Sequence, residues 1–171
     1  MSILIAIATA HNSTRDIAQR IATRLATHTT GPIDVIDAAD VPPDSIPQYS
    51  AVILGSAVHA RSWLSPARRF LHTQRAVLSD RPVWAFSVGV PDTEAHGKVE
   101  QEMLGNYVRK ELPGLEGHVL FTGRVEREHI AWPVRLIFKW FPKIWKFGDF
   151  IKWDEVDAWA DGVGGSLNKG A

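Results

Sequence analysis

The sequence predicts an α/β domain built on a doubly wound, five-stranded parallel sheet, with a long insertion between strand five and the last helix. Two patterns lead to this prediction. Short apolar runs alternate along the chain with segments whose apolar residues recur at helical spacing. The first run, Ile3–Ala8, is apolar throughout, which is typical of a parallel strand covered on both faces. With 171 residues, 45% of them hydrophobic, the chain can bury the core of one such domain, and we expect residues 1–171 to form it.

The elements of the first half follow from the spacing of apolar residues and from proline. A helical pattern follows the opening strand directly, with one apolar face and one polar face. A Pro-rich stretch is expected to be a loop, because proline lacks the amide hydrogen that regular elements use. In order, we predict a helix with Ile17, Ile21 and Leu25 on its apolar face, a strand at 33–36, a loop at 41–47 and a strand at 51–56.

The second half repeats the alternation and then departs from it. Ser65 and Pro66 form a plausible N-cap and first helical position, and Pro113 with Gly114 ends a later helix. We predict helices at 65–78, 99–112 and 153–162, and strands at 82–88 and 118–122. About 30 residues, 124–152, separate the fifth strand from the last helix, which is far longer than an ordinary connection.

Charge and composition exclude several classes of function. Lys plus Arg and Asp plus Glu number 19 each, so no overall field draws the chain to nucleic acid, and an acidic electron shuttle is disfavoured. Without cysteine there are no disulfides, thiolate metal sites or cysteine nucleophiles, and we predict no metal site. No run approaches the ~18 apolar residues of a spanning helix, and the N-terminal run lacks the basic start of a signal peptide.

The turn between the first strand and the first helix is the candidate phosphate site. Such a turn presents backbone N–H groups and the positive end of the helix to an anion, and several side chains here add donors. An ordinary N-cap at Ser13 or Thr14 explains the same residues without a ligand. There is no dinucleotide fingerprint and no nucleoside triphosphate loop. The candidate ligands are Thr9, Ala10, His11, Asn12, Ser13 and Thr14.

The insertion has an unusual composition. Residues 132–153 hold eight of the sixteen aromatic residues, together with four lysines and one arginine. Aromatic rings interleaved with cations are typical of a helix lying in the membrane interface on anionic lipid. The alternative is that the rings pack on the sheet edge and the lysines form a solvated face. The candidate substrate or membrane contacts are Trp132, Arg135, Lys139, Trp140, Phe141 and Trp145.

The turn at 9–14 resembles the phosphate loop of the flavodoxin family, T-x-[TS]-G-x-T before a helix. Thr9 and Thr14 match, His11 replaces a hydroxyl residue, and Asn12 replaces the glycine, whose positive φ asparagine tolerates best. The resemblance implies a flavodoxin-like fold and FMN as cofactor. It also implies flavin contacts after the third and fourth strands. These candidates are Ser56, Ala57, Val58, His59, Trp63, Ser87, Val88, Gly89 and Val90.

Two aromatic residues near these loops have competing interpretations. Trp63 either stacks on the flavin ring or packs against the core at the helix entry, and the sequence leaves both open. His59 is expected to face solvent, and Trp84 is expected in the core. The flavin carries the redox chemistry in such proteins, so we name no catalytic acid or base.

Over nearly its full length the chain is similar to one flavodoxin branch, the bacterial quinone (menaquinone)-linked protoporphyrinogen IX dehydrogenases. The similarity includes Gly123, with Trp132, Arg135 and Lys139 at the intervals of that branch, and residues 153–156. It implies an FMN-dependent dehydrogenase of haem biosynthesis that passes electrons from a porphyrinogen to a membrane quinone. The protein would then be cytoplasmic and peripheral on the inner face of the cell membrane, held by anionic lipid.

Two other functions are compatible with the sequence. The first is a soluble flavodoxin-type electron carrier that docks on protein partners. The second is an NAD(P)H:quinone reductase, although no nicotinamide site is recognisable. The sequence also leaves open whether the chain forms a homodimer.

Overall fold

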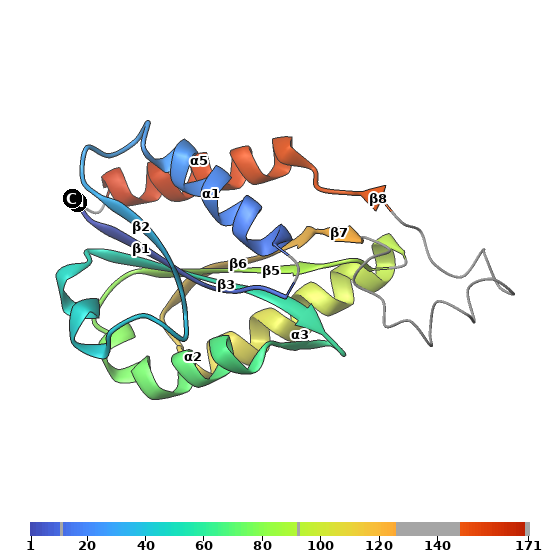
Figure 1. The fold of residues 1–171 in the computed structure, drawn as a ribbon, viewed down its shortest axis with the longest axis horizontal. Helices are drawn as coiled ribbons and strands as arrows, with labels where there is room; N and C mark the ends of the chain where they lie inside the picture. Colours follow the sequence, from blue (N-terminus) through green and yellow to red (C-terminus); the bar gives the residue numbers. More distant parts are fainter. Residues whose placement is uncertain (11, 92, 126–147, 170–171) are drawn as a thin grey trace, which may run out of the picture.

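The computed structural model describes residues 1–10, 12–91, 93–125 and 148–169. Figure 1 shows a central sheet with helices on both faces. Five strands lie parallel: β1 (Ile3–Ala8), β2 (Ile33–Asp37), β3 (Ala51–His59), β5 (Val83–Gly89) and β6 (Leu115–Thr122). Their order across the sheet is β2-β1-β3-β5-β6, and a short strand, β4 (Ser62–Trp63), pairs antiparallel with β3.

This strand order creates a switch point between β1 and β3. The chain moves from β1 outward to β2 and then returns to the other side of β1, so the connections leaving β1 and β3 diverge. In open parallel sheets of this kind, ligands bind at the carboxyl ends of the strands beside such a point. The predicted doubly wound parallel sheet of five strands is confirmed.

Two helices cover each face of the sheet (Figure 1). α1 (Ser13–Leu25) and α5 (Trp153–Lys169) pack on one face, against a core that includes Ile5, Phe86 and Phe121. α2 (Ser65–Leu78) and α3 (Glu94–Glu111) pack on the other, against Leu4 and Val52. Because both faces are covered, all six residues of β1 are buried, as the continuous apolar run predicts. Trp84 lies in the core, as expected.

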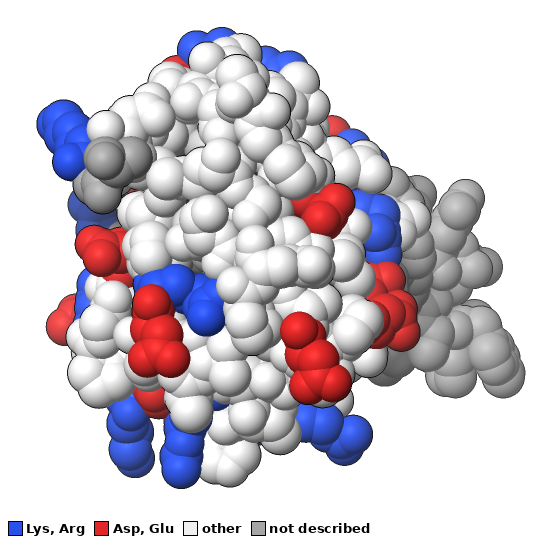
Figure 2. Space-filling model, turned by 90° about the vertical axis from the view of Figure 1, so that its left-hand side faces the viewer, with Lys and Arg blue, Asp and Glu red and all other residues white. Residues whose placement is uncertain are grey.

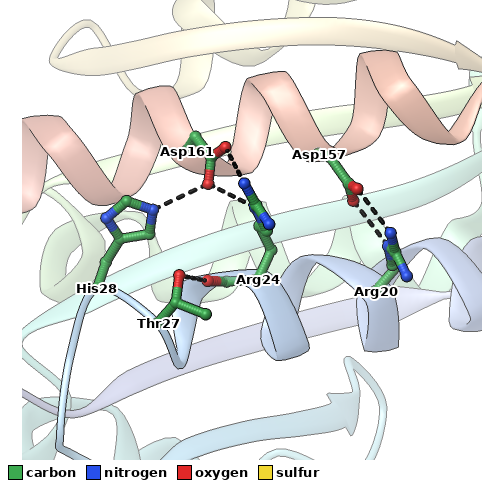
Figure 3. A network of polar contacts seen from close by, with 6 residues as sticks. All are labelled: Arg20, Arg24, Thr27, His28, Asp157 and Asp161. Atoms are coloured by element: carbon green, nitrogen blue, oxygen red, sulfur yellow. Dashed lines mark hydrogen bonds and ion pairs between the residues drawn. The ribbon is translucent and has the colours of Figure 1, made fainter.

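α1 and α5 are also joined by a ladder of ionic contacts on their outer surface (Figure 3). Arg20 forms a bidentate pair with Asp157, with N–O distances of 2.7 and 2.6 Å, and Arg24 forms one with Asp161 at 2.7 and 2.8 Å. His28 Nε2 lies 2.9 Å from the same Asp161 carboxylate. The partners recur every four residues on each helix, so one face of α1 matches one face of α5 over two turns.

Several predicted boundaries were wrong. Residues 41–47 were expected to be a loop, but Pro43–Gln48 form a 3-10 helix, since proline at its start needs no amide hydrogen and already has the required φ. α3 begins five residues before the predicted start, because the Thr93 side chain accepts a hydrogen bond from His96 N–H and caps the helix. β6 also begins earlier than expected, at Leu115.

The last helix continues past Gly162, where we predicted its end, to Lys169. Glycine is poor in helix interiors, but at Gly164 packing requires it. A Cβ at Gly164 would lie 2.5 Å from Cγ of His28, so only glycine lets α5 approach the end of α1 this closely. The tertiary contact therefore outweighs the local propensity.

The two ends of the insertion pair with each other as a small ribbon. β7 (Arg124–Val125) runs antiparallel to β8 (Gly148–Asp149), and the Thr122 hydroxyl donates a hydrogen bond to the Phe150 carbonyl. The sequence predicted neither strand. The ribbon fixes where the insertion leaves and re-enters the domain.

Surface charge is mixed on the side of the molecule where the parallel strands begin. Figure 2 shows acidic and basic side chains scattered there among uncharged ones, without a continuous patch of one sign. Within the described part of the chain, every helix is too short or too polar to cross a bilayer.

Candidate functional site

The turn after β1 has the backbone geometry of an anion site. Asn12 adopts the left-handed conformation, with φ 59°, and its carbonyl accepts the hydrogen bond from Asp16 N–H that opens α1. Its side chain makes no capping hydrogen bond, so it leaves the first-turn N–H groups of α1 uncapped. The structure thus confirms that asparagine occupies a positive-φ position in this turn.

Three side chains of this turn, those of Thr9, Ser13 and Thr14, supply hydroxyl groups. Thr9 Oγ1 is buried and has no hydrogen-bond partner among the described residues. A buried hydroxyl without a partner costs free energy unless a ligand satisfies it. Ser13 and Thr14 are buried at the start of α1, with 7% and 1% of their surface exposed. Ala10 is exposed beside them, and His11 lies outside the described residues.

Three chain segments converge on the start of α1. Gly123, after β6, donates its N–H to the carbonyl of Gly89, the last residue of β5, at 2.8 Å. A Cβ at Gly123 would lie 2.9 Å from Val88 Cγ1 and 3.8 Å from Ser13 Cβ, so the absence of a side chain lets the three segments meet. The loop after β5 and the phosphate turn are therefore neighbours at the carboxyl edge of the sheet.

The loop after β3 is more regular than the sequence suggested. β3 continues to His59 and turns back into β4 through Ala60 and Arg61. Ser56 is fully buried, and its Oγ donates to the Ala57 carbonyl and accepts from Leu64 N–H. Its hydroxyl therefore has protein partners, and a ligand could use only the backbone here. Ala57 and Val58 are half-buried and His59 is exposed, as expected for His59.

Trp63 belongs to the core, which decides between its two interpretations. Only 2% of its surface is exposed, and its ring meets Tyr107 edge-on at a centroid distance of 6.4 Å. Its Nε1–H donates to Ser87 Oγ at 2.7 Å. A buried ring offers no free face for stacking on a flavin, so the expectation of a stacking contact is wrong for this residue.

Ser87 continues this buried polar chain to His118 on β6. Ser87 is fully buried, and its Oγ lies 2.9 Å from His118 Nε2. Since Ser87 Oγ already accepts from Trp63, its own hydrogen is available for His118. Burial, followed by the charge of Arg109, lowers the pKa of His118 from 6.5 to about 4. The imidazole is therefore neutral at pH 7, and these hydrogen bonds tie β5 to β6 and to β4, just before the start of α2.

The root of the insertion contacts the phosphate turn through Arg124. Its N–H donates to Ser13 Oγ at 3.3 Å, and its guanidinium lies 3.4 Å from Asp16 and 2.9 Å from Asp149. Burial acts to raise the pKa of Asp149, but hydrogen bonds from Arg124 and from Ile151 N–H outweigh it and hold the pKa below its usual value. Sequence reasoning missed Arg124, whose only signal was its place at the start of the insertion.

The remaining predicted contacts are divided between the loop after β5 and the insertion. Val88 is buried and Gly89 is half-buried at the end of β5, and Val90, the first residue of the loop, is exposed. The predicted substrate or membrane contacts of the insertion lie outside the described residues. These are Trp132, Arg135, Lys139, Trp140, Phe141 and Trp145.

The arrangement fits a phosphate monoester. An uncapped helix start, a left-handed residue before it and a buried hydroxyl without a partner are the features that an anion would satisfy together. The backbone groups after β3 and β5 lie at the same edge of the sheet. They could contact a ring system attached to the phosphate.

Comparisons with known proteins agree with this geometry. A family model described as Flavodoxin domain matches residues 4–146. A flavodoxin from the domain Archaea superposes with a TM-score of 0.64 at 14% identity, over 98% of this chain and 99% of that one. Flavodoxin 1 from Bacillus cereus superposes with a TM-score of 0.55 at 16% identity, over 85% of this chain and 100% of that one. An NADH:FMN oxidoreductase superposes with a TM-score of 0.52 at 15% identity, over 71% of this chain and 74% of that one.

A comparison with curated proteins found no match. The solved structures are all distant in sequence and establish the fold, whereas the family model covers most of the chain. Flavodoxins bind FMN as their cofactor. Because the matched residues span well over half of its length, the chain belongs to the flavodoxin domain family.

Proposed function

We propose that this protein is an FMN-dependent oxidoreductase that passes electrons from a reduced substrate to a membrane quinone, with protoporphyrinogen IX as the substrate. The contact between the root of the insertion and the phosphate turn carries the proposal. Arg124 touches both Ser13 and Asp16 at the start of α1, so the segment that distinguishes this chain is anchored at the cofactor site.

The residues of the turn would hold the FMN phosphate. Thr9 Oγ1 would donate its unused hydrogen, and the first-turn N–H groups of α1 would supply further donors. Backbone groups of residues 57–59 and 88–90 would border the ring. When bound, FMN supplies the electron-accepting and electron-donating chemistry, while the protein orients and shields it. No side chain is assigned as acid or base.

The insertion would bring this site to the membrane. Its rings and cations suit the interface of a bilayer that contains anionic lipid, where the quinone is dissolved. Arg135 and Lys139 of the insertion would pair with the carboxylates of a porphyrin substrate. The protein would act from the cytoplasmic side, bound peripherally to the inner face of the membrane.

Anaerobic spectroscopy of the FMN-loaded protein tests this function. Addition of protoporphyrinogen IX is expected to bleach the flavin absorbance, and menaquinone in vesicles is expected to restore it. Bleaching by NADH but not by the porphyrinogen would assign the protein to the quinone reductases. Failure of a folded sample to take up FMN would contradict the cofactor assignment itself.

A second candidate is a soluble electron carrier. The structural similarity to flavodoxins over nearly the whole chain favours it. A carrier would exchange electrons with a reductase or another redox protein and would ignore both the porphyrinogen and quinone-containing vesicles. The same experiment therefore separates the two functions.

A further inference from the structure

A pocket of about 290 Å³ opens beside the loop that follows β5. Val90 at the start of this loop forms one wall, and Val99 and Met103 on α3 form another. These three account for all but one of the large hydrophobic side chains exposed in the described part of the chain, with 45%, 66% and 39% of their surfaces accessible. Such a concentration of exposed apolar side chains in one hollow marks a binding site.

Arg61 supplies the pocket with a cation. It lies at the tip of the β3–β4 hairpin and lines the same hollow. Within the part of the chain that the structure describes, no carboxylate forms an ion pair with it. Glu100 and His96 also line the pocket, and each interacts with another group. The positive charge of Arg61 thus remains available to a ligand.

The backbone that presents Arg61 is strained. Ala60 and Arg61 have φ values of 48° and 61°, the conformation of a two-residue turn that favours Asn-Gly. Neither residue type adopts positive φ readily, and glycine would relieve the strain at both positions. A strained position that carries a charged side chain over a pocket indicates a functional constraint on that side chain.

From these features we propose that the pocket binds a small apolar molecule that carries a carboxylate, with its rings against Val90, Val99 and Met103 and its carboxylate on Arg61. The pocket is concave and near the lower end of the size range of small-molecule sites, so a ring system fits it better than a protein surface. Assigning this ligand as the electron donor rests on the proposed function, because Val90 begins a loop expected to border FMN. The binding itself does not.

The test uses 2-naphthoate and its uncharged analogue 2-naphthamide as probes. The FMN-loaded protein is labelled with ¹³C-methyl methionine, and only Met1 and Met103 respond. Met1 precedes the amino end of β1, at the opposite edge of the sheet from the pocket. Naphthoate is expected to shift the Met103 signal but not Met1, and to bind more tightly than naphthamide.

Matched glycine variants separate charge from turn strain. Arg61→Gly and Ala60→Gly should both raise the melting temperature, since both relieve positive φ. Only Arg61→Gly should weaken naphthoate, by about fivefold, as for loss of a largely exposed ion pair, and should leave naphthamide unchanged. Arg61→Lys should bind naphthoate within about twofold of the unmodified protein.

Three outcomes would overturn the inference. Equal affinity for the two probes, or unchanged naphthoate affinity in Arg61→Gly, would show that the pocket does not recognise a carboxylate. If neither probe shifts the Met103 signal, the pocket does not bind small apolar molecules, and a protein partner would be its occupant. Loss of FMN from a folded Arg61→Gly variant would make the pocket part of the cofactor site. If the protein binds naphthoate as described but never takes up FMN, the proposed function fails and the pocket stands.

Discussion

Thr9 combines two properties that are rarely found together in one side chain. Its hydroxyl is buried, yet it bonds to no described residue. Within the described part of the chain, no other group compensates the loss of its hydration, which a ligand could do. We therefore expect the Thr9 hydroxyl to contribute to ligand binding and not to the stability of the fold. A mutation that removes it should separate the two effects.

Thr9→Val is expected to weaken FMN binding by about 1–3 kcal/mol, the value for a hydrogen bond to a charged group. Stability without FMN should be unchanged or higher, because an unsatisfied buried hydroxyl is removed. FMN fluorescence quenching and urea unfolding measure the two effects. Thr23→Val is the matched control, since the Thr23 hydroxyl donates to the Gln19 carbonyl on the outside of α1. Equal FMN affinity in both variants would place the phosphate elsewhere.

His118 makes stability depend on pH. Its folded pKa of about 4 lies below the unfolded value of 6.5, so between these limits the unfolded chain binds the proton and the folded protein does not. The free energy of unfolding should fall as the pH drops from 6.5 to 4, by about 3 kcal/mol at most. His118→Gln should flatten this part of the profile while its amide can still contact Ser87. Urea unfolding at several pH values measures the slope, and parallel profiles for the two proteins would contradict the prediction.

At the scale of elements, the contact between α1 and α5 is both apolar and ionic. Ile17 and Ile21 pack beneath, in one core with Val156 and Ala160, while the carboxylates of α5 meet the cations of α1 above. The outer pairs are solvent-exposed, and such pairs contribute little individually. Their regular spacing instead favours one register between the two helices, because a slip of one turn would leave one rung unpaired.

Asp161→Asn tests this ladder. Hydrogen bonds from Arg24 and then from His28 lower the pKa of Asp161 from 3.8 to about 2. A depressed carboxyl pKa contributes stability above 3.8 that disappears as the pH falls towards 2. The variant should therefore melt a few degrees below the unmodified protein at pH 7, and the difference should vanish near pH 2 and shrink in high salt. A difference independent of pH and salt would show that packing, and not charge, is responsible.

The elements also show which sequence signals are reliable. The boundaries of β1 and α2 were predicted to the residue, because an apolar run and a proline in the first helical turn are local signals. The N-cap of α2 is Leu64, however, and not Ser65 as predicted. The extension of α5 and the early start of α3 were missed. Gly164 is tolerated through a contact with His28, which is distant in sequence, and no propensity reports that contact.

For the whole molecule, the unequal distribution of charge matters more than its total. The chain is neutral, yet five cations and eight aromatic rings fall within residues 132–153. The side of the protein where the strands begin carries mixed charge (Figure 2). Any attraction to an anionic surface should therefore come from the insertion, at the edge of the sheet where Arg124 and Asp149 anchor it.

We expect the protein to co-sediment with vesicles that contain phosphatidylglycerol and to be released as salt rises. Each cation contributes about 1 kcal/mol at such a surface, and the rings add interfacial burial. Replacing Trp140, Phe141 and Trp145 together by Ser should abolish co-sedimentation and leave FMN affinity intact. Vesicles of phosphatidylcholine alone provide the control. Loss of FMN in the triple variant would show that the rings cover the flavin or the core, and no vesicle binding by the unmodified protein would favour the soluble carrier.

The sequence by itself determined the alternation of strands and helices, the turn between β1 and α1 and the glycine-like role of Asn12. Each of these depends on neighbours within a few residues, where apolar spacing and backbone preference act directly. Only the tertiary structure decided that Trp63 lies in the core and that His118 is neutral. It also decided that Arg124 contacts the start of α1 and that Arg61 lines the pocket. Burial, pKa and ion pairing depend on atoms that are far apart in the chain, and the packing of the sheet and its helices brings them together.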